Sequence, residues 1–221
     1  MKYKNSFYDT IILAGGRSKR FGSQKCCFNF LGKPLIEWVL KEFDSPTVVC
    51  KREVISCISD IENVRIYIEG DNDFQGPINA IKKVLNYIKF DNVFITGCDY
   101  PFIKKGIADI LCSRDGEIRI LFDGDFQPLI ACYSTNFLRK NINHIYKMKD
   151  LLKLAKEIYL LGINEIRLID PTLNSIKNIN TIDDFFQKNK NYTISRFIEM
   201  RNVEYSSIYK NVEYFKESYN Q

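Results

Sequence analysis

The chain has 221 residues with 45% hydrophobic and 14% aromatic content, and a net charge of +5 from 32 basic against 27 acidic residues. This length and composition fit one large α/β domain, with at most a small appendage. No hydrophobic segment approaches the ~18 residues that a membrane span needs, and the polar N-terminus lacks a signal-peptide core. The modest charge disfavours a nucleic-acid partner. We therefore expect a cytoplasmic protein, with no membrane contact, that binds an anionic small molecule.

Seven cysteines and one histidine restrict the metal chemistry that is available to the chain. No cysteine pair has C-x-x-C spacing, and a single histidine disfavours a zinc cage. We interpret most of the cysteines as small buried hydrophobic residues. Cytosolic disulfides stay open as an alternative for a chain from a hyperthermophile.

The first half of the chain alternates predicted strands with predicted helices. Strands are predicted at 8–13, 47–50, 64–68 and 92–96, a short extended piece at 26–31, and helices at 34–43, 51–59, 77–88 and 104–113. Proline at the first helical position, as at Pro34 and Pro77, is typical of a helix start. This alternation predicts parallel βαβ units with right-handed crossovers.

The second half departs from that alternation. Two strands, at 118–122 and 128–133, flank the sequence Asp-Gly-Asp, which is a hairpin signal and predicts one late antiparallel strand. After them we predict helices at about 135–147 and 149–161, and a strand at 163–169.

These elements predict a three-layer α/β/α fold with a mostly parallel sheet over residues 1–188. Residues 189–221 carry spaced aromatic side chains. We predict that they form a helical C-terminal extension that serves packing or self-association.

A glycine-rich, basic loop follows the first predicted strand. Residues 13–25 read L-A-G-G-R-S-K-R-F-G-S-Q-K. Glycines let backbone amides approach a ligand closely, and inward amides together with lysine and arginine form an anion site. The spacing fits neither the Walker loop nor the dinucleotide fingerprint. The loop therefore predicts a phosphate site of another type, and the alternative is a solvated basic surface loop.

Two further loops follow strands that should end at the same edge of the sheet. Residues 69–77 are acidic and rich in helix breakers, and Asp99 follows the strand at 92–96 within Gly-Cys-Asp-Tyr-Pro. Open α/β sheets bind ligands at this edge. Mg²⁺ is commonly held there by one or two carboxylates together with phosphate oxygens. We predict that Lys25 neutralises a phosphate and that Asp99 binds Mg²⁺, the alternative for Asp99 being an Asx-type turn cap.

Over roughly residues 8–188 the chain resembles the molybdenum cofactor guanylyltransferases. The matching segments are residues 13–25, 32–35, 76–77, 97–103 and 178–184. The first and fourth are shared by many nucleotidyltransferases, whereas the last, N-I-N-T-I-D-D, is more discriminating. The chain departs from the family at residues 78–80, where Ile-Asn-Ala stands in place of the usual Leu-Ala-Gly.

This resemblance implies a Rossmann-like nucleotidyltransferase domain that transfers GMP from GTP to molybdopterin, with Mg²⁺ as cofactor and release of pyrophosphate. The implied nucleotide-binding residues are Leu13, Ala14, Gly15, Gly16, Arg17, Lys25, Asp71 and Asp99, and Asp73 in the same loop stays open as the alternative to Asp71. Of these, Lys25 and Asp99 are implied to be catalytic, and Asp99 to bind the metal. Asn178 and Asn180 are implied to face the acceptor, and Asn180 also suits a helix N-cap.

Other functions remain open. Relatives that transfer CMP to the same cofactor more often have Leu-Ala-Ala-Gly in the loop, so Gly15 and Gly16 favour the guanylyl type. A sugar-1-phosphate or cobinamide-phosphate nucleotidyltransferase is a second enzymatic alternative. From a different class, the chain could be a nucleotide-binding regulator without turnover.

Overall fold

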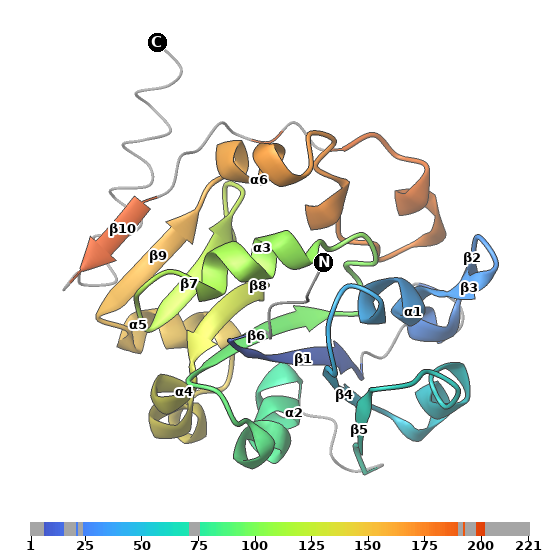
Figure 1. Ribbon diagram of the computed structural model, residues 1–221, viewed down its shortest axis with the longest axis horizontal. Helices are drawn as coiled ribbons and strands as arrows, with labels where there is room; N and C mark the ends of the chain where they lie inside the picture. Colours follow the sequence, from blue (N-terminus) through green and yellow to red (C-terminus); the bar gives the residue numbers. More distant parts are fainter. Residues whose placement is uncertain are drawn as a thin grey trace.

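A computed structural model describes residues 7–15, 21, 24–70, 76–189, 192 and 198–201. In this part of the chain, eight strands form one sheet in the order β10-β9-β7-β8-β6-β1-β4-β5 (Figure 1). The strands are β1 Asp9–Ala14, β4 Thr47–Cys50, β5 Arg65–Ile68, β6 Asn92–Gly97, β7 Ile118–Phe122, β8 Phe126–Ser134, β9 Glu157–Leu161 and β10 Ile198–Arg201. β8 and β10 run antiparallel to their neighbours, and the other pairs are parallel. The predicted sheet, mostly parallel with a late antiparallel strand, is confirmed.

Helices cover both faces of this sheet. The α-helices are α1 Leu35–Leu40, α2 Pro77–Val84, α3 Lys105–Cys112, α4 Thr135–Asn141, α5 Leu151–Leu154 and α6 Ile163–Ile169. The 3₁₀-helices are η1 Lys25–Cys27, η2 Arg52–Cys57, η3 Leu85–Tyr87, η4 Ile142–His144, η5 Met148–Asp150, η6 Asn174–Ile176 and η7 Ile182–Phe185. A short hairpin joins β2 Asn29–Phe30 to β3 Lys33–Pro34.

Two separate cores confirm the three-layer arrangement. Helices α2, α4 and α5 pack on one face and α1, α3 and α6 on the other. Successive strand residues alternate between the cores: Ile11 belongs to the first and Ile12 to the second, and both are fully buried. This is the period of two that a strand covered on both faces requires.

Two predictions in the second half were wrong. Residues 157–161, predicted as helix, form β9, whose Ile158, Tyr159 and Leu160 are buried against β7. Residues 163–169, predicted as a strand, form α6. There Ile163 and Ile166 are buried while Leu168 is 86% exposed, which is helical spacing. In a segment this rich in isoleucine and leucine the period is hard to read, and pairing with β7 decides the conformation.

Smaller differences lie in the first half. Within the helix predicted at 51–59, Arg52–Cys57 form a 3₁₀-helix rather than an α-helix. The predicted extended piece at 26–31 is the end of η1 followed by β2. The helix predicted at 34–43 ends at Leu40.

Part of the predicted helical tail is a strand. Residues 198–201 form β10, which pairs antiparallel with β9 and adds an edge strand to the sheet. The other residues after 192 lie outside the described part of the chain. We keep as a proposal that residues 1–188 form the catalytic domain and residues 189–221 an extension of it.

Six of the seven cysteines form disulfides. The pairs are Cys26–Cys98, Cys27–Cys57 and Cys112–Cys132. Cys50 keeps a buried thiol. Its pKa is raised to about 11, mainly by burial and then by the Glu69 and Glu53 carboxylates. Our interpretation of most cysteines as unpaired hydrophobic residues was therefore wrong. Spacing missed the pairs because all three join segments that only the folded chain brings together.

None of the helices in the described residues is long and apolar enough to cross a membrane.

Candidate functional site

A cleft opens at the carboxyl edge of the parallel strands, where the loops after β1, β5 and β6 meet. Its wall is formed by Leu13, Gly15, Lys25, Val49, Glu69, Gly76, Pro77, Ala80, Gly97, Cys98, Asp99 and Leu129, and its volume is about 160 Å³. Ligand sites usually measure ≈ 300–1,000 Å³. Residues 16–20 and 71–75, which belong to two of the bordering loops, lie outside the described part. The described wall is therefore one portion of the site.

The end of β1 brings the glycine loop to this cleft. The backbone amide of Cys98 donates to the Leu13 carbonyl at 3.0 Å, which fastens the end of β1 to the end of β6. Ala14 is buried, and Gly15 follows it in the cleft wall. A side chain at Gly15 would collide with Oε2 of Glu69. Glycine thus lets the Glu69 carboxylate lie against the backbone here, and a larger residue would have to displace that side chain.

Asp99 stands in the turn after β6, directly beneath the cleft. A Cβ at Gly97 would collide with Oδ1 of Asp99, so the glycine makes room for the carboxylate to fold back over the strand end. The Asp99 carbonyl accepts from the amide of Ile179 at 2.8 Å, and its Oδ2 accepts from Nδ2 of Asn178 at 3.1 Å. Both the backbone and the side chain of Asp99 are therefore held in place.

Lys25 begins η1 and faces Asp99. Its Nζ lies 3.9 Å from Oδ2 of Asp99, with side chains 14% and 20% exposed. The same Nζ donates to the carbonyl of Ile179 at 3.1 Å and to Oδ1 of Asn180 at 3.3 Å. Burial lowers the pKa of Lys25, while the nearby carboxylates of Asp99 and Asp184 act in the opposite direction. The pair is a cation and an anion in a largely desolvated setting.

Residues 178–180 thus connect the two predicted catalytic residues. The N-cap of the following 3₁₀-helix η7 is Thr181, not Asn180, in a capping box with Asp184. The Asp184 carboxylate accepts from the amides of Asn180 and Thr181 at 2.7 and 2.8 Å. These hydrogen bonds fix the residues that precede η7 beside Lys25 and Asp99.

Glu69 is a site residue that the sequence reasoning missed. It follows β5 directly, lines the cleft beside Gly15 and is only 7% exposed. Its amide donates to the Cys50 carbonyl at 2.8 Å, which continues the β4–β5 pairing by one residue. The signal was present, since Glu69 occupies the same position after its strand that Gly15 and Cys98 occupy after theirs.

Burial also makes Glu69 sensitive to pH. It raises the pKa of this carboxyl above its ordinary value of 4.5, and Lys83 and Lys51 oppose the rise only in part. A carboxyl with the higher pKa in the folded state binds its proton more tightly there, so folding stability falls as pH rises through that window. We expect Glu69→Gln to remove this fall and to be more stable than the native chain at neutral pH. Thermal unfolding from about pH 4 to pH 7 measures this difference in stability, with exposed Glu62→Gln as the control. Parallel curves of melting temperature against pH for the native chain and Glu69→Gln would contradict the expectation.

The side-chain oxygens of Asp99 and Asn178 are of the kind that can bind a divalent cation. Within the described residues no three His, Cys, Asp or Glu side chains cluster as a complete metal cage. However, Oδ1 of Asn178 is buried beside Asp99 without a hydrogen-bond partner. Mg²⁺ prefers such oxygens, and it usually takes its remaining ligands from water and substrate phosphates. Asp99 and Asn178 are thus the described residues suited to hold it.

Of the predicted site residues, seven lie in the described part of the chain. Leu13, Gly15, Lys25 and Asp99 line the cleft, Ala14 lies at the strand end, Asn178 contacts Asp99, and Asn180 contacts Lys25. Gly16, Arg17 and Asp71 lie outside the described residues.

The fold is an open α/β sheet, and a cation and a carboxylate face each other at its carboxyl edge, an arrangement suited to a phosphorylated ligand. Residues 10–158 match the MobA-like NTP transferase domain, so the chain belongs to that family. It is a nucleotidyltransferase, as the resemblance predicted.

Relatives of the chain carry a more specific name. A probable molybdenum cofactor guanylyltransferase of Methanosarcina mazei is 28% identical over 203 residues, covering 82% of this chain and 89% of its own length. A molybdenum cofactor guanylyltransferase of Desulfosudis oleivorans is 30% identical over 185 residues, covering 79% and 90%.

A solved structure agrees with these relatives. Molybdopterin-guanine dinucleotide biosynthesis protein A from Archaeoglobus fulgidus superimposes with a TM-score of 0.65 at 26% identity, over 80% of this chain and 95% of that one. A nucleotidyl transferase from Methanothermobacter has a TM-score of 0.63 at 17% identity, which is a likeness of fold alone.

Proposed function

We propose that this enzyme transfers GMP from GTP to the phosphate of molybdopterin. An oxygen of the acceptor phosphate forms a bond to the α-phosphorus of GTP, and the bond from that phosphorus to the β-phosphate oxygen breaks to release pyrophosphate. The observation that carries the proposal is the contact of residues 178–180 with both Lys25 and Asp99. The segment most typical of molybdopterin enzymes thereby lies beside the predicted phosphate-binding pair. The names of the relatives support the same acceptor.

Each residue has a physical task in this reaction. Nucleotidyltransferases of this family generally use a divalent metal, and we propose Mg²⁺, which would neutralise phosphate charge when held at Asp99 and Asn178. Lys25 binds the phosphates through its ammonium, which is worth most where water is excluded. The glycine loop at Gly15 offers backbone amides, and it needs no side chain to do so.

Pyrophosphate release from a panel of nucleoside triphosphates, with and without molybdopterin, tests the proposal. We expect release only with GTP, molybdopterin and Mg²⁺ together. Release with CTP instead would make the enzyme a cytidylyltransferase, and turnover of a sugar 1-phosphate or cobinamide phosphate would identify one of the other transferases. GTP binding without pyrophosphate release for any acceptor would indicate a regulator.

The contact of Asn178 with Asp99 changes the expected effect of its removal. From the sequence alone, Asn178→Ala should weaken use of molybdopterin only. Because Asn178 holds the Asp99 carboxylate, we now expect kcat to fall by about tenfold to a hundredfold and the Mg²⁺ requirement to rise. Steady-state kinetics at several Mg²⁺ concentrations measures both, and Lys177→Ala serves as the neighbouring control. If Asn178→Ala raised only the KM for molybdopterin, Asn178 would serve acceptor binding alone.

A further inference from the structure

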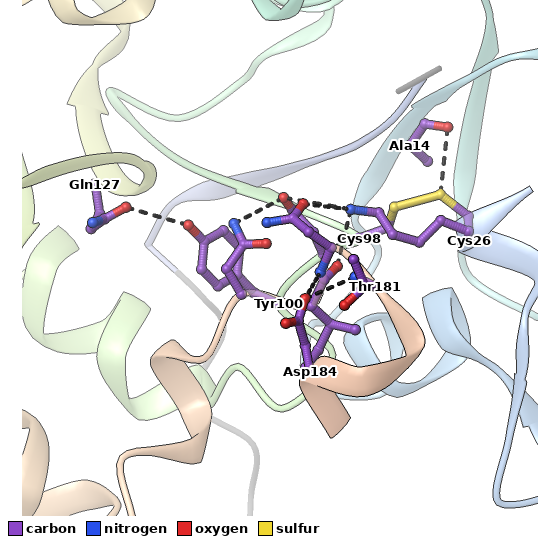
Figure 2. A network of polar contacts seen from close by, with 12 residues as sticks. Ala14, Cys26, Cys98, Tyr100, Gln127, Thr181 and Asp184 are labelled. Atoms are coloured by element: carbon purple, nitrogen blue, oxygen red, sulfur yellow. Dashed lines mark hydrogen bonds and ion pairs between the residues drawn. A yellow bond between two sulfur atoms is a disulfide. The ribbon is translucent and has the colours of Figure 1, made fainter. Parts of the chain in front are cut away.

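One disulfide joins the two segments that carry the proposed catalytic residues. Cys26 follows Lys25, Cys98 precedes Asp99, and their sulfurs are bonded. In Figure 2 this disulfide lies beside the contact network of the cleft, next to Ala14 at the end of β1. Cys26 is 2% and Cys98 4% exposed, so the bond is packed into the core rather than lying on the surface.

The non-covalent attachments of η1 to β6 are few in the described residues. The backbone amides of Cys27 and Phe28 donate to the nearby carbonyls of Gln24 and Lys25, and the Phe28 carbonyl accepts from Leu35 at the start of α1 rather than from β6. The Lys25 ammonium itself reaches Asp99 only at 3.9 Å. A covalent bond one residue away from each partner therefore limits how far these two side chains can separate. The adjacent disulfide, Cys27–Cys57, fastens the same helix to η2 instead.

We propose that the Cys26–Cys98 disulfide is a positioning element of the active site, which sets the separation of Lys25 and Asp99 and makes catalysis dependent on thiol oxidation state. A dithiol reverses it: the sulfur–sulfur bond breaks, Cys26 and Cys98 become thiols by gaining two electrons and two protons, and the dithiol becomes a disulfide. Reduction frees η1 from the end of β6. For turnover the proposal rests on the nucleotidyl transfer proposed above, but the geometry of Lys25 can be tested without it.

The position of Cys98 in the cleft wall adds a consequence. Thiolate attack on a disulfide requires access to a sulfur. Because Cys98 is one of the residues that line the cleft, we expect bound GTP to slow reduction of Cys26–Cys98. The Cys27–Cys57 bond lies elsewhere and is not protected.

The experiment compares two double variants under non-reducing conditions: Cys26→Ala with Cys98→Ala, and Cys27→Ala with Cys57→Ala as the matched control. One readout is kcat and the KM for GTP. The other is the acetylation rate of Lys25 by acetic anhydride, measured by mass spectrometry relative to exposed Lys140. The same readouts are taken on the native chain before and after treatment with dithiothreitol, with free thiols counted by alkylation. Peptide mapping without reductant establishes the pairing.

We expect loss of Cys26–Cys98 to lower kcat about tenfold to a hundredfold, because small misplacements of reacting groups have effects of this size. Lys25 acetylation should rise at least about fivefold relative to Lys140, while the control variant changes neither value more than about twofold. Dithiothreitol should reproduce both effects in the native chain and in the control variant, but have none in the Cys26–Cys98 variant.

Unchanged Lys25 acetylation in the reduced native chain would overturn the proposal, as would peptide mapping that finds Cys26 and Cys98 as thiols. If the Cys26–Cys98 variant does not fold, the reduced native chain decides. If no nucleotide and acceptor give turnover, the proposed function fails, whereas the acetylation rates still decide whether the disulfide positions Lys25.

Discussion

Asp99→Asn should leave folding nearly unchanged and reduce turnover by about 10²–10⁴-fold. Asparagine keeps the shape of the side chain, and the backbone contact between Asp99 and Ile179 does not depend on the charge. What is lost is the negative charge that would hold a cation and balance Lys25, 3.9 Å away. Metal charge stabilisation is worth several kcal/mol, and each 1.4 kcal/mol or so is a factor of ten in rate.

Turnover and the melting temperature should be measured on the same preparation of this variant. Asp60→Asn is the matched control, since it removes an exposed carboxylate that is not part of the described cleft wall. If Asp99→Asn retained turnover within a few-fold of the native enzyme, the assignment of Asp99 as the metal ligand would be wrong. The turn after β6 would then be explained by its contacts with residues 178–180 alone.

Lys25→Ala should raise the KM for GTP and also lower kcat, each by about tenfold to a hundredfold. An ammonium on a phosphate acts in both the ground state and the transition state, so both parameters move. A hydrogen bond to a charged group contributes about 1.5–3 kcal/mol. Direct measurement of GTP binding by calorimetry, beside steady-state kinetics, separates the two effects.

Stability distinguishes this role from a structural one. Burial already lowers the pKa of Lys25, which means that the folded protein bears a desolvation cost for its charge. Removal of the ammonium should therefore change the melting temperature little, and Lys33→Ala, which loses only a surface pair with Glu37, is the control. A lowered melting temperature with unchanged kinetics would show that Lys25 serves the fold.

The sequence predicted the meeting of three loops at one edge because parallel strands in alternation with helices leave little choice of topology. Lys25 and Asp99 could be placed there from the glycine pattern and from a lone aspartate after a buried strand. Glu69 was missed because two aspartates further along the same loop attracted the interpretation, although its position after β5 makes it the residue that faces Gly15. A carboxylate at the first position after a buried strand is the more informative signal.

Contacts between distant segments could not be predicted. Asn178 is 79 residues from Asp99, and nothing in its own segment indicates which partner it will have. The same holds for the disulfides, of which Cys26–Cys98 spans 72 residues. The predictions for β9 and α6 were wrong for a different reason. Runs of isoleucine and leucine satisfy the strand period and the helix period alike, and only pairing with β7 identifies the strand.

The contacts of residues 178–180 also order the events of synthesis on the ribosome. Chains emerge from the N-terminus and begin to fold before they are complete. The strands that pair with β1 precede residue 100, so the central part of the sheet can assemble early. Lys25 and Asp99 have by then already been synthesised. Their shared partners Ile179 and Asn180 leave the ribosome long afterwards. A nascent chain can therefore acquire the central strands of its sheet before residues 178–180 organise the proposed active site, and a ribosome stalled before residue 178 would carry a chain in which Lys25 and Asp99 still lack those partners.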